Sequence, residues 1–557
     1  MRKVDIGNYS FEELVSKNNF YIDKTLFIKD YIESSSKVTL ITRPRRFGKS
    51  INLDMLEHFL DISLNSSGLF EGLNISNYSE FMEQHLNKYP VIYLDLKDLD
   101  GLTSDKFREK FYYKVRSMYV KYKSFITGEA IATSDKDAYD DIFNNINEAV
   151  ATDSLRLLVE LLSKSHGVNP IVLIDEYDMP LEKAYANGYY KDAISLIGVF
   201  LSSALKGNKY LNKALLIGCS KVAQAGIFSG LNNLTVHSIN NDSKFNTYFG
   251  FTEDEIKESL KEYNLEETFA DVKYWYDGYD FNGKTIYNPW SVTNYLDKKK
   301  FDYYWVNTGS LRHIRESLYG IKNYKKLFIS LIQDEKVVGL YSDFISYSKG
   351  KLSKNDILSL LYQAGYLKMI DDNEYLAVNY EAKESLKVEF IEMLEENADI
   401  PDGYIEFFIN LTKLNIPAAI SNYEEILNDT LFSDHESSHH ALLMVASHSI
   451  KGTYTASREQ SNAAGRSDLV LKSIDKSTGF VIEVKRAGVD AKETLDDLIV
   501  DALQQINSRN YASVLAREGY AKIHHVAIAI KGANVSIKFE QKDYPEYNQM
   551  KDYLVYI

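Results

Sequence analysis

Two segments of the chain combine residue types and spacing that suit phosphate chemistry. The first, RPRRFGKS at residues 43–50, places Gly48, Lys49 and Ser50 after an apolar run. A phosphate-binding loop needs backbone N–H groups at a helix N-terminus, a lysine for the β- and γ-phosphates and a hydroxyl for Mg²⁺. Arg43 replaces the first glycine of the usual motif, so the segment alone also fits a basic turn capped by Ser50.

The run IVLIDEYD favours nucleotide binding because it ends in Asp175 and Glu176. After a buried strand, the first carboxylate would hold Mg²⁺ through water and the second would orient the attacking water. The alternative is a carboxylate that merely ends a strand. A further apolar run, ALLIGCS, places Ser220 where a γ-phosphate sensor would lie. The predicted ATP site comprises Arg46, Gly48, Lys49, Ser50, Asp175 and Ser220, with Ser50 and Asp175 as Mg²⁺ ligands and Glu176 as a catalytic residue.

The second segment, residues 465–485, reads GRSDLVLKSIDKSTGFVIEVK. Asp468 begins one predicted strand, and Glu483 and Lys485 lie on the next. Side chains alternate along a strand, so Glu483 and Lys485 share one face. Metal-dependent phosphodiester cleavage uses oxygen ligands for Mg²⁺ or Mn²⁺ and a lysine that stabilises charge on phosphate; the carbonyl of Val484 is a further ligand candidate. The bare pattern also fits a cross-strand ion pair on a solvated hairpin.

A competing metal pattern precedes this segment. His435, Glu436 and His439 spell HESSH, the H-E-x-x-H pattern of zinc peptidases, and Glu459 lies at a reasonable distance for a third ligand. The residues around the histidines are polar, whereas a peptidase helix is apolar on its buried side. We therefore expect surface histidines on a helix that begins near Glu436, and the zinc peptidase is the least favoured alternative.

These residues need elements that position them. In the first part of the chain, apolar runs alternate with helical stretches, which predicts a parallel sheet with helices on both faces. The predicted strands begin at Val38, Val91, Ile171 and Ala214, and two of the predicted helices span Lys106–Tyr122 and Lys191–Leu205.

From Phe251 the pattern is mostly helical, with a turn-rich insert at Trp275–Val292. Residues Ile357–Leu367 and the short strands after them predict a helix with a wing. After Leu431, two strands joined by the turn DKSTG, a helix at Glu493–Asn507 that carries two glutamines, and two further strands predict an α/β unit with a central hairpin.

Several motifs together resemble one known family. RPRRFGKS, LIDEYD, GFTEDEI, WYDGYDF and YNPWSV are similar to motifs of the bacterial AAA-ATPase-like family that carries a C-terminal PD-(D/E)XK nuclease domain, and the similarity runs over nearly the whole chain. GRSDL and IEVKRA resemble that nuclease domain. The resemblance implies that Arg43 departs from the general loop motif and not from the family's. It also implies catalytic roles for Asp468, Glu483 and Lys485, with Glu436 or Glu459 completing the metal shell.

The expected fold is therefore α/β. We predict an AAA-like P-loop domain with a parallel sheet at residues 1–250, a helical lid region at 251–345, a winged-helix-like or helical connector at 346–430, and an α/β PD-(D/E)XK nuclease-like domain at 431–557.

Composition narrows the functional classes. The 557 residues carry a net charge of −15, which argues against a general nucleic-acid coat. Residues 431–557 hold 15 Lys and Arg against 16 Asp and Glu, so a nucleic-acid contact is better placed there than in the acidic remainder. The single cysteine, Cys219, excludes an intramolecular disulfide and fits a reducing compartment. With no apolar run typical of a signal peptide or membrane span, we expect a cytoplasmic protein without a membrane partner.

The favoured function is an ATP-binding and ATP-hydrolysing regulatory module joined to a Mg²⁺-dependent nuclease. DNA is favoured over RNA as the substrate, and a homo-oligomer is a further expectation. The alternative is a nucleotide-dependent nucleic-acid-binding or assembly protein that does not cut. The presence of both Glu483 and Lys485 favours cutting, because a domain that only binds could lose either residue.

Overall fold

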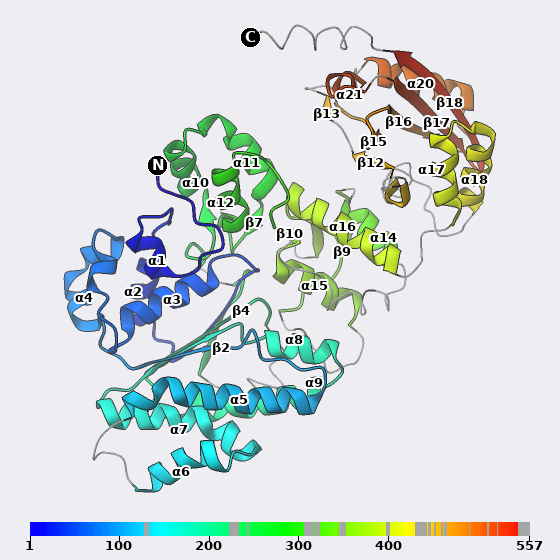
Figure 1. Ribbon diagram of the computed structural model, residues 1–557. Coiled ribbons are helices and arrows are strands. Elements are labelled where there is room, and N and C mark those ends of the chain that lie inside the picture. Colours follow the sequence, from blue (N-terminus) through cyan, green and yellow to red (C-terminus); the bar gives the residue numbers. More distant parts are fainter. Residues whose placement is uncertain are drawn as a thin grey trace. The chain divides into compact units, whose positions relative to one another are not determined.

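A computed structural model provides the fold of this chain (Figure 1). Two units, Met1–Glu389 and Phe390–Ile557, each have their own internal packing. The structure describes residues 1–126, 133–221, 233–241, 244–305, 318, 324–332, 334–343, 345, 352–371, 373–396, 402–428, 443, 447–450, 453–457, 460–461, 465–488, 491–508, 512–520 and 522–543.

The first unit is built on a five-stranded sheet in the order β2-β3-β4-β1-β5. All neighbouring strands are parallel, as predicted from the alternation of strands and helices. The segments that follow β1, β3 and β4 therefore leave the same edge of the sheet, where ligands bind in α/β proteins. The strands are β1 (Val38–Thr42), β2 (Val91–Asp95), β3 (Ile171–Asp175), β4 (Lys213–Gly218) and β5 (Leu234–His237).

Helices cover both faces of this sheet (Figure 1). On one face, apolar side chains of α1, α2 and α3 form a core with β1, β3 and β4. On the other face lie α5, α7 and α9, and α7 packs along α9. The helices are α1 (Phe11–Ser16), α2 (Leu26–Ile32), α3 (Lys49–Leu60), α4 (Ser79–His85), α5 (Ser104–Tyr122), α6 (Thr133–Asn144), α7 (Glu148–His166), α8 (Met179–Ala186) and α9 (Tyr190–Leu205).

After Phe251 the first unit is mostly helical, with two small sheets. The segment predicted as a turn-rich insert holds a hairpin and the start of α12, where the Asn288 side chain caps the helix ahead of Pro289. The predicted helix and wing are α15 with a sheet in the order β10-β11-β9. The elements are β6 (Phe251–Thr252), α10 (Glu253–Glu262), α11 (Phe269–Tyr276), β7 (Tyr279–Asp280), β8 (Thr285–Tyr287), α12 (Pro289–Lys298), α14 (Tyr324–Ile332), β9 (Val337–Val338), α15 (Lys354–Ala364), β10 (Leu367–Asp371), β11 (Glu374–Ala377) and α16 (Tyr380–Glu396).

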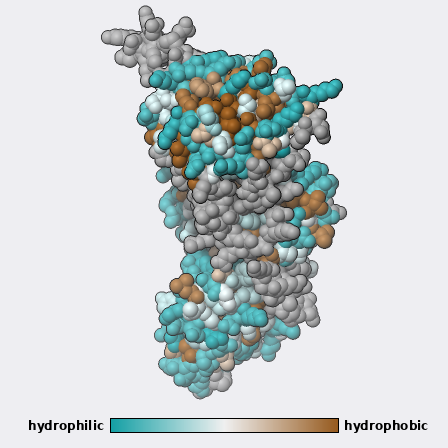
Figure 2. Space-filling view, turned by 90° about the vertical axis from the view of Figure 1, so that its right-hand side faces the viewer, coloured by the Kyte–Doolittle hydropathy of each residue, from teal (hydrophilic) through white to brown (hydrophobic). Residues whose placement is uncertain are grey.

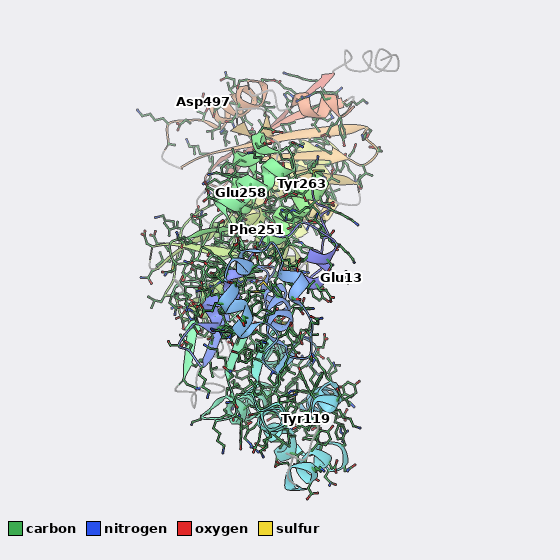
Figure 3. The ribbon with its side chains drawn as sticks, turned by 90° about the vertical axis from the view of Figure 1, so that its left-hand side faces the viewer. Glu13, Tyr119, Phe251, Glu258, Tyr263 and Asp497 are labelled. Atoms are coloured by element: carbon green, nitrogen blue, oxygen red, sulfur yellow. The ribbon has the colours of Figure 1, made fainter. Side chains whose placement is uncertain are left out.

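The N-terminal segment is fixed to α10. Arg2 Nη2 donates to Glu262 Oε2 at 2.7 Å, and the Tyr263 hydroxyl donates to the carbonyl oxygen of Arg2 at 2.6 Å. The ring centroid of Phe20 lies 6.3 Å from that of Phe251 and 5.6 Å from that of Tyr263; both partners are labelled in Figure 3. These contacts hold the start of the chain beside the helices that follow the parallel sheet.

The second unit contains a five-stranded sheet in the order β12-β15-β16-β17-β18. β15 and β16 form the predicted hairpin, β16 and β17 are parallel, and β17 and β18 are antiparallel. Apolar side chains of α20 pack on β16 and β17. Among the described residues, no helix has the length and apolar character of a membrane span. The elements are α17 (Asp402–Thr412), α18 (Ile416–Asn428), β12 (Tyr454–Ser457), β13 (Gln460–Ser461), β14 (Gly465–Arg466), β15 (Leu469–Ser473), β16 (Thr478–Ala487), α20 (Leu495–Ser508), α21 (Ala512–Arg517), β17 (Lys522–Lys531) and β18 (Asn534–Asp543).

Candidate nucleotide and nuclease sites

The loop between β1 and α3 ends in a helix start that suits an anion. Gly48 is the N-cap residue of α3 and has a left-handed backbone with φ of 78°. A residue with a Cβ would be strained in this conformation, so glycine is favoured there. Lys49 and Ser50 lie in the first turn of α3, where backbone N–H groups have no intrahelical acceptor. The start of α3 thus offers backbone N–H donors and the positive end of a helix to a phosphate.

Lys49 points into the loop, and only 4% of the residue is exposed. Its Nζ donates to the carbonyl oxygens of Arg43 at 3.3 Å and Pro44 at 3.2 Å, and it lies 3.7 Å from Glu176 Oε1. Burial works to lower the pKa of Lys49, but Cys219 and Glu176 outweigh it, so the pKa is raised. Burial raises the pKa of the Cys219 thiol to about 12, so this thiol carries no charge at neutral pH.

Ser50 joins the loop to the end of β3. Its hydroxyl donates to Asp175 Oδ2 at 2.6 Å, and the Tyr93 hydroxyl lies 3.5 Å from the same oxygen. Burial, followed by the charge of Glu176, raises the pKa of Asp175 to about 6. A hydroxyl and a carboxylate are hard oxygen donors, so the pair fits a Mg²⁺ ion, whose charge would favour the ionised carboxylate.

Glu176 directly follows β3 and has a left-handed backbone with φ of 50°. Its Oε2 is buried, and within the described part of the chain no donor reaches it. A buried carboxylate oxygen without a donor is an expected feature of a group that binds or activates a water molecule. The predicted role in orienting the attacking water is compatible with this geometry and stays a prediction.

A cavity of about 690 Å³ brings these residues together. Its other walls come from the N-terminal segment and from the first turn of α12. The guanidinium of Arg46 lies 4.2 Å from the ring centroid of Trp290, a cation–π contact at the cavity wall. The predicted residues that line the cavity are Arg46, Gly48, Lys49, Ser50, Asp175 and Glu176, and the other walls include Ile6, Gly7, Ile22, Pro289, Trp290 and Thr293.

In the second unit, Asp468, Glu483 and Lys485 meet at the β15–β16 hairpin. Asp468 Oδ2 accepts a hydrogen bond from the backbone N–H of Val484 at 2.8 Å. Lys485 Nζ lies 3.8 Å from Glu483 Oε1, and Glu483 is 1% exposed. Carboxylates and an ammonium in one place are the groups that metal-dependent phosphodiester cleavage needs. The structure thus brings Glu483 and Lys485 together, as expected from their shared strand face, and bonds Asp468 to the backbone between them, while the catalytic roles of the three stay predictions.

Helix α20 contributes two further side chains to this cluster. Gln505 Nε2 donates to Glu483 Oε1, and Asp501 Oδ2 lies 3.9 Å from Lys485 Nζ. The distance along α20 from Asp501 to Gln505, about one helical turn, is similar to the distance along β16 from Glu483 to Lys485, one strand repeat. The two helix residues can therefore face the two strand residues. The sequence analysis did not single out Asp501; its position four residues before Gln505 is the signal that could have found it.

Comparisons with known proteins agree with both halves of this arrangement. Residues 5–228 match a family described as predicted AAA-ATPase, and residues 435–540 match the PD-(D/E)XK nuclease superfamily. The chain therefore combines a region similar to the AAA-ATPase-like family with a region similar to the PD-(D/E)XK nuclease superfamily. The resemblance seen in the sequence motifs is thereby confirmed. We refer to the two matched regions as the ATPase domain and the nuclease domain.

One curated relative is similar over much of this chain. It is the "Uncharacterized protein in vnfD 5'region" of Azotobacter chroococcum mcd 1, with 25% identity over 379 residues. The match covers 66% of this chain and 64% of that protein, so the chain spans somewhat less than two thirds of the relative's length.

Ser220 is the one predicted residue of the ATP site that is not part of the cavity wall. It is 2% exposed, and its hydroxyl donates to Asp178 Oδ2 at 2.9 Å. Asp178 also accepts from the backbone N–H groups of Cys219 and Ser220 at 2.9 and 2.6 Å. Burial, followed by the charge of Glu182, raises the pKa of Asp178. The sensor role of Ser220 stays a prediction, whereas Asp178, which the sequence analysis missed, fixes the segment after β4 beside the segment after β3.

Several predicted residues of the nuclease domain lie outside the described residues: Glu436, Glu459, and His435 and His439 of the HESSH pattern. The structure therefore tests neither the additional metal ligands nor the zinc-peptidase alternative. The match to the nuclease superfamily begins at residue 435 and includes this pattern, which favours the nuclease interpretation. Val484 lies in β16, and the role of its carbonyl as a metal ligand stays a prediction.

Proposed function

We propose that this protein binds and hydrolyses Mg²⁺-ATP in the cavity of its ATPase domain, and that its nuclease domain cleaves nucleic acid, DNA in preference to RNA. The cluster of Asp468, Glu483 and Lys485 carries the proposal, because it gathers carboxylates, the ligands that Mg²⁺ prefers, and an ammonium at one hairpin. The hydrogen bond from Ser50 to Asp175 supports the ATP part, because it brings together two oxygen donors of the kind Mg²⁺ prefers from residues 125 positions apart in the sequence.

In the ATPase domain, the Lys49 ammonium and the N–H groups at the start of α3 would bind the β- and γ-phosphates. Ser50 and Asp175 would hold Mg²⁺, which neutralises charge on the phosphate oxygens when bound. Glu176 would orient a water molecule for in-line attack and accept its proton. The contact with Trp290 keeps the Arg46 guanidinium at the wall of the same cavity.

In the nuclease domain, Asp468 and Glu483 would hold Mg²⁺ or Mn²⁺, with Val484, Glu436 and Glu459 as further ligand candidates. The ion supplies Lewis-acid stabilisation to the phosphate when bound. Lys485 would stabilise the charge that develops on the phosphate as water attacks phosphorus and the P–O bond to the leaving oxygen breaks. Gln505 holds the Glu483 carboxylate and so fixes the direction of its lone pairs.

The proposal extends to regulation, assembly and location. The nucleotide state of the ATPase domain would control the nuclease domain through a shift between conformations. Apolar side chains gather on one face of the second unit (Figure 2), which supports association between copies into a homo-oligomer. The one cysteine of the sequence, Cys219, is buried and free, which supports a cytoplasmic location.

The deciding experiment incubates purified protein with duplex DNA, single-stranded DNA and RNA, with and without Mg²⁺ and ATP. Lys485→Ala should abolish cleavage and keep nucleic-acid binding, because one lysine adds little to a long phosphate interface but lies where charge develops. Lys522→Ala is the matched control, because Lys522 is exposed at the first residue of β17, opposite Thr478 at the far end of β16. Cleavage at the native rate by the Lys485→Ala protein would refute the nuclease proposal.

A further inference from the structure

The phosphate loop of the ATPase domain is enclosed by the later part of its own unit. The Phe47 ring lies 4.8 Å from that of Tyr279 and 5.5 Å from that of Phe281, measured between centroids. A Cβ added to Gly365, which ends α15, would come within 2.9 Å of the Pro44 side chain. Together with the stacking of Arg46 on Trp290, these contacts attach the loop to the β7–β8 hairpin, to α12 and to the end of α15.

Arg45 of the loop is bound through its main chain as well as through its guanidinium, which lies 3.3 Å from Glu182 Oε2. Trp305 Nε1 donates to the carbonyl oxygen of Arg45 at 3.4 Å, and the Trp305 ring packs 4.6 Å from that of Tyr366. The backbone N–H of Trp305 donates to Glu381 Oε1 at 2.6 Å, and the Ser291 hydroxyl donates to Glu381 Oε2, also at 2.6 Å. Glu381 therefore fixes the position of Trp305, and Trp305 in turn binds the phosphate loop.

Glu381 lies in the helix that contains the boundary between the two units. It lies in the first turn of α16 (Tyr380–Glu396), and it is 1% exposed. The boundary between the two units falls inside the same helix, between Glu389 and Phe390. A helix is a stiff element, so a displacement of its first turn is carried along its length. The residue bound to Trp305 thus belongs to the helix that leads into the second unit.

Phosphate binding has a direct way to disturb this chain of contacts. Lys49 Nζ now donates to the carbonyl oxygens of Arg43 and Pro44. A bound γ-phosphate competes for the same ammonium, so at least part of this bonding must be exchanged. The carbonyl that follows next, that of Arg45, is the one bound to Trp305. A change in the loop backbone can therefore reach Trp305 through the neighbouring carbonyl.

We infer that Trp305 and Glu381 are positioning residues that couple nucleotide binding in the phosphate loop to α16. Through α16 they act on the second unit, which contains the nuclease domain. The inference rests on the proposed function, since it names the route by which nucleotide state acts on the nuclease. It requires that ATP binds the two arrangements of the loop with different affinity, because a ligand without such a difference shifts nothing.

The test compares four full-length proteins: wild type, Trp305→Phe, Glu381→Ala and Ser291→Ala. Trp305→Phe removes the indole N–H that reaches the loop together with part of the ring that packs on Tyr366, and it keeps the backbone N–H that binds Glu381. Glu381→Ala removes the link to α16. Ser291→Ala is the matched control, because it removes the hydrogen bond from Ser291 to Glu381 and leaves the one from the Trp305 N–H. Each protein is examined for Mg²⁺-ATP binding by calorimetry, for hydrogen exchange of residues 380–389, and for DNA cleavage with and without ATP.

In the wild type and in Ser291→Ala, ATP should change hydrogen exchange at 380–389 and change the cleavage rate by about fivefold or more. In Trp305→Phe and Glu381→Ala, ATP should still bind but both responses should be lost. If Glu381→Ala does not fold, Trp305→Phe alone decides. ATP responses of wild-type size in Trp305→Phe would overturn the inference and leave the proposed function intact. A wild type that binds no ATP would overturn both.

Discussion

Replacing Glu381 by glutamine tests whether this buried carboxyl group carries a charge in the folded protein. Burial, opposed by hydrogen bonds from Ser291 and Trp305, raises the pKa of Glu381 from 4.5 to about 7. Glutamine has the same shape, offers a carbonyl oxygen to the Trp305 N–H and an amide to the Ser291 hydroxyl, and cannot ionise. The substitution therefore removes the titration and keeps the contacts.

The size and sign of the effect follow from linkage. A pKa of 4.5 in the unfolded chain and about 7 in the fold corresponds to about 3 kcal/mol, at about 1.4 kcal/mol for each pKa step. Because the folded pKa is the higher one, the stabilising proton is present at low pH and is lost as pH rises through about 7. Wild type and Glu381→Gln should be similarly stable at low pH, and the variant should be more stable by up to about 3 kcal/mol well above the folded pKa.

Thermal unfolding measured at a series of pH values, with one scan rate for both proteins, follows this difference. At about 2 °C or less per kcal/mol for a unit of this size, the midpoint of Glu381→Gln should rise relative to wild type by about 5 °C across the series. Asp175 and Asp178 also have raised pKa values, but both proteins contain them and their effects cancel. A difference that stays constant with pH would refute the argument, because Glu381 would then ionise as freely in the fold as in the unfolded chain.

Three further outcomes test the two sites. Lys49→Ala should abolish ATP binding in a titration, whereas Glu176→Gln should bind ATP and release phosphate slowly; unchanged affinity in Lys49→Ala would contradict the loop assignment. Gln505→Ala should lower kcat for DNA cleavage by about 10-fold to 100-fold with little change in KM, since it orients Glu483 without touching substrate, and an unchanged kcat would remove that role. Metal analysis of dialysed protein should find no stoichiometric zinc, and His435→Ala should keep cleavage; bound zinc lost on that substitution would support the peptidase instead.

Features that depend on local periodicity could be predicted from the sequence. The alternation of apolar runs and helices predicted the parallel sheet. Because Ser50 follows β1 and Asp175 ends β3, the sequence also predicted that both lie at one edge of this sheet. The period of two along a strand put Glu483 and Lys485 on one face, and the structure has them 3.8 Å apart. Glu483 and Lys485 lie on one strand, whereas Ser50 follows β1 and Asp175 ends β3, two parallel strands on either side of β4. In both cases regular strand geometry sets which side chains can meet.

Contacts between remote elements follow no such rule. YNPWSV was noted as a motif, but nothing in its sequence says that Trp290 stacks on Arg46, because the register between α12 and the loop depends on how the whole unit packs. Trp305 lies 260 residues after the Arg45 carbonyl that it binds. The sequence shows that both tryptophans are large and apolar, which predicts that they are buried but does not identify the residues they contact. The route that we propose from nucleotide to nuclease, through Trp305 and Glu381, therefore required a folded structure. The proposed role of these residues depends on which groups they contact, and the residue types alone do not reveal those contacts.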